Sequence, residues 1–336
     1  MINSAIQYHL LNGFDDPMLS PATWNELQTR GSGDNVFMTW HWQKTWWEVF
    51  GRGKLLLIMA VKDLQPIAIA PLFADSEMIF FVGSGGSDYL DLIGETNDPE
   101  ITEGLLSLAI ANTPGVLGCR FYHLPATSST KTVLEKVARK LGWDCFDEGG
   151  LNCPLLSIKD FPEKAVAATM KKSLLRHESW FNRNGGIQIQ HFTRCSDILP
   201  HLDSFFEQHI ARWAGTPFPS LFHDTAQQHF YKRLCETASE TGWLCFTVLT
   251  WQQNPIAFHF GMNYKGNFLW YKPSFDITLA KHSPGEVLLR QLLLKAICEK
   301  AAHFDFGLGE ESFKDRFASS TASVQNIGLY PPSITN

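Results

Sequence analysis

An eight-residue stretch recurs about half a chain length apart, and this repeat limits the possible folds more than any other feature of the sequence. Residues 63–70 read DLQPIAIA and residues 252–259 read QQNPIAFH. In both copies one apolar run precedes the turn residues and another follows them, which is the pattern of a β-hairpin. The repeat predicts duplication of one β-rich unit.

Each copy begins a similar series of predicted elements. Predicted strands cover residues 55–61, 67–73, 78–82, 119–124, 143–146, 155–158, 243–249, 256–262, 268–275 and 303–307, and predicted helices cover residues 99–112, 130–141, 161–184 and 284–302. Within each copy the strands of the meander come first and helices pack against them. The predicted fold class is therefore α+β, with a mixed sheet flanked by helices in each unit.

The chain length supports this division, because 336 residues exceed the usual size of a single core. We expect an N-terminal unit over residues 1–160, a basic linker helix over 161–185 and a C-terminal unit over 186–336. A formal net charge of −6 argues against broad electrostatic capture of nucleic acid or an anionic membrane. We expect no membrane insertion, because no apolar run is long enough to span a bilayer.

The seven cysteines are scattered and include no Cys-x-x-Cys pair, and the amino terminus lacks a secretion signal. Both features predict reduced cysteines and a cytoplasmic location. No set of cysteines and histidines has zinc-ligand spacing, so we predict no metal site. The Gly-x-Ser-x-Gly and phosphate-loop signatures are also absent.

The start of the predicted helix at residue 284 is the strongest candidate for a binding site. The N-H groups of a first helical turn and the positive end of the helix dipole favour a phosphate. Pro284 has no N-H, which leaves those of Gly285, Glu286 and Val287 as donors. An alternative uses the same residues, because Ser283 and Glu286 also have the spacing of a capping box. The candidate cofactor-binding residues are Lys281, His282, Ser283, Pro284, Gly285, Glu286 and Val287.

Four motifs in the same order as in a known family extend this interpretation. They are GSGGSDYLD at residues 83–91, WYKPSFD at 270–276, SPGEVLL at 283–289 and FDFGLGEESFKDRF at 304–317. In these motifs the chain resembles the GNAT-type acetyltransferases associated with cellulose biosynthesis, which are related to the Fem-type peptidyltransferases. The similarity runs from about Trp40 to Tyr330.

The resemblance implies tandem GNAT units and an N-acyltransferase. The C-terminal unit would bind acyl-CoA, acetyl-CoA or a longer form, with its pyrophosphate at the helix start. That implication favours the binding interpretation of Ser283 over the plain cap. An amine acceptor, which is a small molecule, saccharide or peptide, would lie between the units and attack the thioester directly.

The resemblance also implies roles for single residues, since acyl transfer needs a base for the amine and a stabiliser for the oxyanion. The implied catalytic residues are Asp305, Glu310, Lys314 and His259. The implied substrate-binding residues are Asp88, Tyr89, Asp91, Tyr271 and Asp276. For each carboxylate, a structural ion pair at a strand end is the alternative.

The sequence departs from the family at Phe313, where relatives carry a tyrosine before the signature lysine. A hydroxyl that could protonate the leaving thiolate is therefore absent there. Tyr271 or Tyr330 could replace it, or the thiolate needs no acid because its pKa is far below that of an amine. The general acid is unassigned.

Two other functions remain open. A Fem-like enzyme would take its acyl group from aminoacyl-tRNA and would need the positive charge of residues 171–183. A degenerate GNAT pair would instead bind a ligand or partner without turnover. Comparing acetyl-CoA, long-chain acyl-CoA and charged tRNA as stabilising ligands separates these possibilities.

Overall fold

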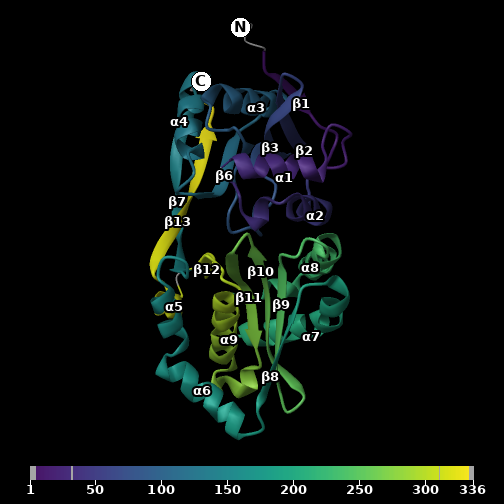
Figure 1. Ribbon diagram of the computed structural model, residues 1–336. Coiled ribbons are helices and arrows are strands. Elements are labelled where there is room, and N and C mark those ends of the chain that lie inside the picture. Colours follow the sequence, from purple (N-terminus) through teal and green to yellow (C-terminus); the bar gives the residue numbers. More distant parts are fainter. Residues whose placement is uncertain (1–4, 32, 310, 333–336) are drawn as a thin grey trace. The chain divides into compact units, whose positions relative to one another are not determined.

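The chain forms two compact units in the computed structural model, which describes residues 5–31, 33–309 and 311–332. The first unit comprises the chain up to Asn152 together with a C-terminal stretch that starts at Ala322, and the second comprises Cys153–Thr321. Strands β7 (Asp144–Ser157) and β13 (Ser320–Tyr330) each pass from one unit into the other (Figure 1). The C-terminal strand therefore completes the N-terminal unit.

The first unit is built on a mixed sheet with the order β1-β2-β3-β4-β6-β13-β7, and β5 pairs with β3. The pair β4 and β6 is parallel, whereas β13 lies antiparallel to β6. Its other strands are β1 (Gln7–Leu10), β2 (Lys54–Lys62), β3 (Gln65–Asp75), β4 (Met78–Phe81), β5 (Ile93–Gly94) and β6 (Gly118–Pro125). Its helices are α1 (Pro21–Arg30), η1 (Val36–Met38), α2 (Trp40–Phe50), α3 (Pro99–Ala111) and α4 (Thr130–Leu141).

The second unit has the strand order β7-β12-β11-β10-β9-β8, in which β11 and β12 are parallel. Its strands are β8 (Ile187–Phe192), β9 (Leu244–Trp251), β10 (Asn254–Tyr264), β11 (Asn267–Phe275) and β12 (His303–Asp305). Its helices are α5 (Pro162–Thr169), α6 (Lys172–Arg183), α7 (Cys195–Trp213), η2 (Leu221–His223), α8 (Thr225–Ala238), η3 (Ile277–His282), α9 (Pro284–Cys298) and α10 (Ser312–Asp315). The predicted α+β class with a mixed sheet in each unit is confirmed.

The sequence repeat corresponds to the same hairpin in both units. Each hairpin has a two-residue turn with positive φ at both positions: Asp63 and Leu64 in the first, Gln252 and Gln253 in the second. This is the geometry of a type I′ turn, whose twist matches that of the flanking strands. In each hairpin the register then shifts at the isoleucine of the repeat, Ile67 or Ile256.

Two regions of the chain differ from their prediction. The single helix predicted over residues 161–184 is two helices, α5 and α6, which both pack against α9. The two strands predicted at 143–146 and 155–158 are one strand, β7, which continues through Gly149 and Gly150. An added Cβ at Gly150 would lie 2.3 Å from the Val324 carbonyl oxygen of β13. A close backbone approach, and not a turn, therefore accounts for this glycine.

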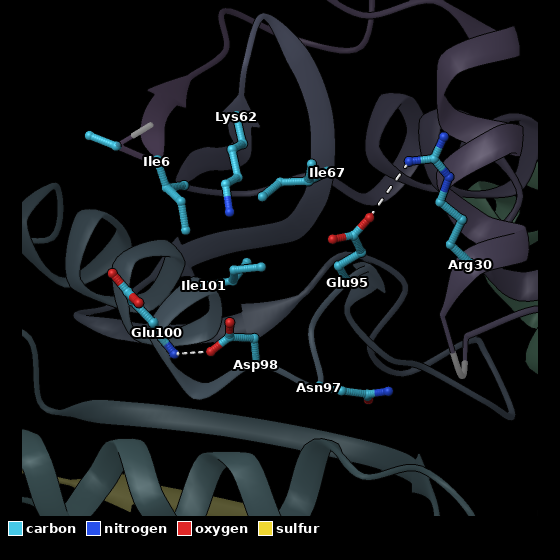
Figure 2. Close-up of a pocket in the computed structure, with 10 residues that line it drawn as sticks. Ile6, Arg30, Lys62, Ile67, Glu95, Asn97, Asp98, Glu100 and Ile101 are labelled. Atoms are coloured by element: carbon cyan, nitrogen blue, oxygen red, sulfur yellow. Dashed lines mark hydrogen bonds and ion pairs between the residues drawn. The ribbon is translucent and has the colours of Figure 1, made fainter. Parts of the chain in front are cut away.

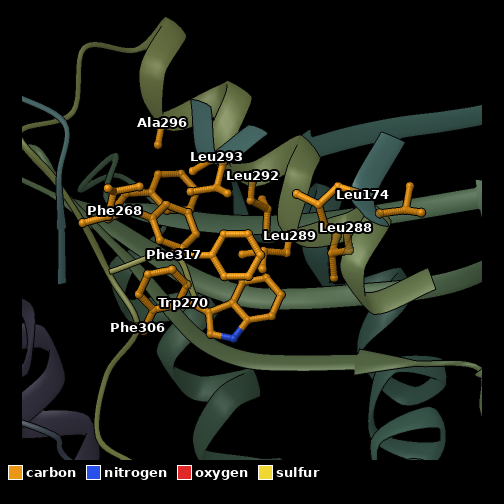
Figure 3. Close-up of a cluster of buried hydrophobic side chains, with 14 of the residues drawn as sticks. Leu174, Phe268, Trp270, Leu288, Leu289, Leu292, Leu293, Ala296, Phe306 and Phe317 are labelled. Atoms are coloured by element: carbon orange, nitrogen blue, oxygen red, sulfur yellow. The ribbon is translucent and has the colours of Figure 1, made fainter. Parts of the chain in front are cut away.

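Helices cover both faces of the sheet in the second unit. Helix α9 lies along β10 and β11 and buries Leu288, Leu292 and Leu293 against Phe268 and Trp270 (Figures 1 and 3). On the other face, Phe205 of α7 packs on aromatic side chains of β9 and β10, which are Phe246, Phe258 and Phe260. These two cores hold the strand ends and the start of α9 in place.

Candidate functional site

The start of α9 lacks the side-chain cap that its sequence suggests. Ser283 has φ 52° and ψ 57°, in the left-handed region, and its side chain makes no cap hydrogen bond. Its carbonyl oxygen accepts the N-H groups of Glu286 at 3.0 Å and Val287 at 3.3 Å. The capping-box alternative is therefore wrong. Of the three donors predicted for a phosphate, only the Gly285 N-H makes no hydrogen bond within the described residues.

The Glu286 carboxylate points sideways instead of back to the helix start. It lies 3.2 Å from Nη1 of Arg316 and 3.6 Å from Nε2 of His177. Arg316 also donates to the Ser173 hydroxyl at 3.1 Å. No local sequence pattern indicates this cluster, because His177 on α6 is far from Glu286 along the chain. The only signal was the basic character of residues 171–183.

The remaining residues around this helix start differ in exposure. Lys281 is exposed, whereas Pro284 and Val287 are buried. The His282 ring stacks on Trp180 with centroids 3.4 Å apart. Desolvation, helped by the nearby Lys281 and His177, lowers the pKa of His282, so its ring is neutral near pH 7. His282 therefore contributes a stacked aromatic ring here and not a charge.

Strand β11 connects the point where it parts from β12 with this helix start. The two strands pair in parallel from Asn267 to Leu269, and the last pair is Leu269 with Asp305. Strand β12 ends there, while β11 runs on to Phe275. A Cβ added to Gly285 would lie 3.0 Å from Cδ1 of Phe275, so the end of β11 packs directly against the first turn of α9.

Two of the predicted catalytic residues hold the loop that follows β12. Asp305 is 4% exposed; it accepts the Gly307 N-H at 2.8 Å and the Asn267 side-chain amide at 3.2 Å. Lys314 is 3% exposed, and its Nζ donates to the Leu308 carbonyl at 2.8 Å. It also forms an ion pair with Glu311 at 2.7 Å. The structure thus brings these two side chains to one loop, where a buried ammonium has its charge compensated.

Glu310, the third of these candidates, lies outside the described residues. His259, the fourth, is fully buried in β10, and its Nε2 accepts the Tyr271 N-H at 3.2 Å. Burial lowers the pKa of His259 to about 3. A side chain without solvent access, already engaged as an acceptor, is poorly placed to collect a proton from an amine.

The predicted substrate residues of the second unit have local partners. Tyr271 is buried, and Nζ of Lys272 lies 4.1 Å from the centre of its ring. The Asp276 carboxylate accepts the Thr278 N-H at 2.9 Å and the Thr278 hydroxyl at 2.7 Å, and so caps η3. Tyr330, a possible general acid, belongs to the first unit and binds the side chains of Arg120 and Glu148.

The predicted acceptor residues of the first unit divide into two kinds. Asp88 and Tyr89 are half-buried. Asp91 is fully buried; it accepts the Leu92 N-H at 2.8 Å and the Thr130 hydroxyl at 2.5 Å. Asp91 is therefore not accessible to an acceptor. Its role is structural, because it bonds to Thr130, the first residue of α4.

One pocket of the first unit contains none of the predicted site residues. It has a volume of about 510 Å³ and lies between the start of α3 and the β2–β3 hairpin (Figure 2). Its lining mixes apolar and charged side chains: Ala5, Ile6, Arg30, Lys62, Ile67, Glu95, Asn97, Asp98, Glu100 and Ile101. Arg30 pairs with Glu95 at 3.7 Å.

In residues 5–31, 33–309 and 311–332 no group of three or more histidine, cysteine, aspartate or glutamate side chains could hold a metal ion. Among the helices that the structure describes, none combines the length and apolar character that a bilayer crossing requires.

Residues 168–315 match the sequence profile of the acetyltransferase (GNAT) domain family. This part of the chain is similar to GNAT domains. It lies within the second unit and includes the start of α9, and the match confirms the resemblance drawn from the four motifs. No curated protein matches the sequence.

Solved structures extend the likeness to nearly the whole chain. The chain is similar to FemX, with 8% identity, a TM-score of 0.65 and coverage of 91% of this chain and 96% of that one. It is also similar to a tandem GNAT protein from the clavulanic acid biosynthesis pathway (9% identity, TM-score 0.53, 98% and 100% coverage). A third is L-PGS from Bacillus licheniformis (13% identity, TM-score 0.54, 87% and 91% coverage). The tandem GNAT fold is thus confirmed over nearly the whole chain.

Proposed function

We propose that the protein is an N-acyltransferase that moves an acyl group from acyl-CoA to an amine acceptor. The uncapped start of α9 supports this proposal most strongly. The Ser283 hydroxyl makes no cap hydrogen bond and the Gly285 N-H has no partner within the described residues, so this end of the helix can still accept an anion. A diphosphate would occupy the place of the missing cap.

Strand β11 offers a surface along which the rest of the donor could bind. Beyond Leu269, β11 runs from the end of its pairing with β12 to the first turn of α9. A donor bound by its diphosphate at Gly285 would extend its acyl arm along this strand toward Asp305. Lys281, exposed just before the helix, would add positive charge for the phosphates.

For the chemistry we propose a reaction centre beside the loop that follows β12. The amine must lose a proton before it attacks the thioester carbon, and the resulting oxyanion must be stabilised. Asp305 is our candidate for orienting the amine, and Lys314 for stabilising negative charge. Both also hold the loop itself. Glu310 remains a candidate base, and Asp88 and Tyr89 remain candidates for binding the acceptor.

A comparison of donors tests this proposal. The purified chain would be heated with acetyl-CoA, a long-chain acyl-CoA or charged tRNA, each far above its expected dissociation constant. A ligand present at 100 times its dissociation constant stabilises the folded state by about 2.7 kcal/mol. We expect stabilisation by an acyl-CoA, followed by thiol release when an amine is added.

Each other outcome has a distinct meaning. Stabilisation by charged tRNA alone would replace our proposal with the aminoacyl-tRNA-dependent alternative. Binding of CoA without thiol release across a panel of small-molecule, saccharide and peptide amines would favour a binding protein without turnover. Stabilisation by none of the three ligands would contradict an acyl-donor site in this chain.

A further inference from the structure

His259 is a buried, titratable side chain to which the proposed chemistry gives no role. Its exposed fraction is 0%, and its ring stacks on Trp270 with centroids 5.2 Å apart and planes at 18°. The neighbouring Phe268 ring lies 6.2 Å away at 12°. Its Nε2 accepts the Tyr271 N-H at 3.2 Å, a backbone donor on the adjacent strand. This hydrogen bond requires the neutral ring with its proton on Nδ1, a buried nitrogen that has no hydrogen-bond partner within the described residues.

The hydrogen bond lies at an irregularity in the pairing of β10 with β11. Phe260 pairs with Lys272 and Met262 pairs with Leu269, so Gly261 alone faces two residues, Trp270 and Tyr271. Strand β11 therefore carries the extra residue of a β-bulge. A bulge interrupts the ladder and bends the strand that contains it. The imidazole supplies an acceptor that a regular backbone ladder would otherwise provide for this N-H.

Gly261 provides the space for this arrangement. A Cβ added there would lie 2.0 Å from Cε1 and 2.5 Å from Nε2 of His259, and 2.6 Å from the Leu269 carbonyl oxygen. None of these atoms can be approached so closely without a shift. The position of the His259 ring thus depends on Gly261, because the ring can reach the bulge only if residue 261 has no side chain.

The bulge lies where β11 leaves its other neighbour. On that side the last residue pair with β12 is Leu269 with Asp305, and the bulged residues, Trp270 and Tyr271, follow directly. From there β11 continues to Phe275, whose ring packs on Gly285 at the start of α9. The bend at the bulge therefore sets the course of the segment that connects the parting of the strands with that helix start.

We propose that His259 is a positioning residue: through its hydrogen bond to the Tyr271 N-H it fixes the bulge and so the course of β11. Its effect on the acyl donor rests on the proposed function, because the donor would lie along this segment. Its effect on the strand does not depend on the donor and can be measured without one.

The test compares His259→Leu with His259→Gln in the full chain. Leucine cannot accept a hydrogen bond, so we expect the Tyr271 amide to exchange its hydrogen on the order of tenfold faster. We expect the Michaelis constant for acyl-CoA to rise by a similar factor, with a smaller change in kcat. Glutamine carries a side-chain oxygen that can accept the same N-H, and it should restore both readouts toward wild type.

A matched control separates positioning from general loss of stability. His209 is another buried histidine, whose Nδ1 lies 2.8 Å from the Ser220 hydroxyl on the opposite face of the sheet. His209→Leu should leave the exchange of the Tyr271 amide unchanged relative to neighbouring strand amides. If His259→Leu does not fold, Gly261→Ala keeps the imidazole but removes its space, and it should speed the exchange of the same amide.

The outcomes distinguish the two proposals. Wild-type protection of the Tyr271 amide in a folded His259→Leu or Gly261→Ala variant would overturn the positioning role. Faster exchange of that amide in His259→Leu, reversed in His259→Gln, would support it even if no acyl-CoA bound to the wild-type protein. A failure of acyl-CoA to bind to the wild-type protein would count against the proposed function alone.

Discussion

Lys314 combines a buried ammonium with two partners on one loop, the Leu308 carbonyl and the Glu311 carboxylate. Replacing it with methionine keeps the apolar stem but removes both contacts. We expect Lys314→Met to lower the free energy of unfolding by about 2 kcal/mol, the scale of a hydrogen bond to a charged group. We also expect turnover to fall more than donor binding weakens, because the loop and the positive charge serve the chemical step.

Urea denaturation and steady-state kinetics measure the two effects. Lys136→Met is the matched control, because Lys136 is exposed on α4 and its loss should change stability by no more than about 0.5 kcal/mol. Wild-type turnover in Lys314→Met would remove Lys314 from the mechanism. Unchanged stability would remove it from the structure of the loop.

The two buried histidines of the second unit predict a pH dependence of stability. Burial lowers the pKa of both His209 and His259 to about 3, from an ordinary value of 6.5. Below pH 6.5 the unfolded chain binds protons that the folded chain does not bind until about pH 3. The contribution of these histidines to the free energy of unfolding is therefore fully present above pH 6.5. It falls as the pH drops from 6.5 toward 3, by up to about 1.4 kcal/mol per pH unit for each histidine.

Urea denaturation between pH 7 and pH 4.5 tests this expectation. Carboxylates also contribute to the slope, so the comparison is with His209→Gln, which removes one of the two groups. The variant should show a shallower decline with falling pH. An identical slope in the two proteins would mean that His209 binds its proton equally well in the folded and unfolded states.

At this scale the sequence identifies side-chain types but not their burial. Asp88 and Asp91 belong to one motif, yet only Asp91 is fully buried and bonded to Thr130. The Thr130 partner is distant in the chain, so no local spacing could reveal it. His259 likewise resembles a candidate base until its position between two aromatic rings of β11 is known.

Among the elements, the repeated hairpin offers the clearest test of duplication. Leu64 and Gln253 occupy the second position of their type I′ turns, with φ of 63° and 65°. A left-handed conformation costs a residue with a Cβ roughly 1 kcal/mol, and glycine pays no such penalty. We expect Leu64→Gly and Gln253→Gly each to raise the free energy of unfolding by about 0.5 kcal/mol or more, after the greater entropy loss of glycine on folding.

Thermal and urea denaturation report both changes. Leu64→Ala is the control, because alanine keeps the Cβ and should bring no gain in the same position. Leu64 is 90% exposed, so loss of its side chain removes little packing. Destabilisation by glycine in either turn would contradict the equivalence of the two hairpins.

The start of α9 carries a second prediction at this scale. In Gly285→Val the new side chain would press on Phe275, since the first added carbon already lies 3.0 Å from that ring. We expect acyl-CoA affinity to fall on the order of tenfold or more, equivalent to about 1.4 kcal/mol, while the fold is retained. Isothermal titration of the wild type and the variant measures the change.

Gly13→Val serves as the control for this substitution, because a Cβ at Gly13 would meet nothing within 4 Å. Equal donor affinity in Gly285→Val and the wild type would count against the first turn of α9 as the donor site.

The meander strands and helices α3, α4 and α9 could be predicted because their periodicity is local. Helix α4 has the predicted limits, and the meander strands differ from prediction by a few residues at their ends. The failures have a different origin. Strand β7 contains Gly149 and Gly150, which read as a turn in isolation but lie beside β13 in the folded chain. A pairing partner so distant in sequence cannot be inferred from a local pattern.

For the whole molecule, the sequence predicts two related units but not that the C-terminal stretch of the chain rejoins the first unit. The stretch from Ala322 belongs to the first unit, where β13 pairs with β6 from Val324 to Leu329. The prediction assigned this stretch to the C-terminal unit and gave it no strand, because a local hydrophobic pattern does not show which sheet a segment joins. The candidate donor site was found from sequence because it depends on one helix start and one strand that follow each other closely.

We propose that the second unit, which is similar to GNAT domains, binds the acyl donor at the start of α9. The most direct test is to titrate the full chain with acetyl-CoA while recording the resonances of its backbone amides. We predict that the largest changes fall on Gly285, its neighbours in the first turn of α9, and the β11 residues from Trp270 to Phe275. Changes confined to the pocket of Arg30 and Ile101, or no changes at saturating ligand, would contradict the claim.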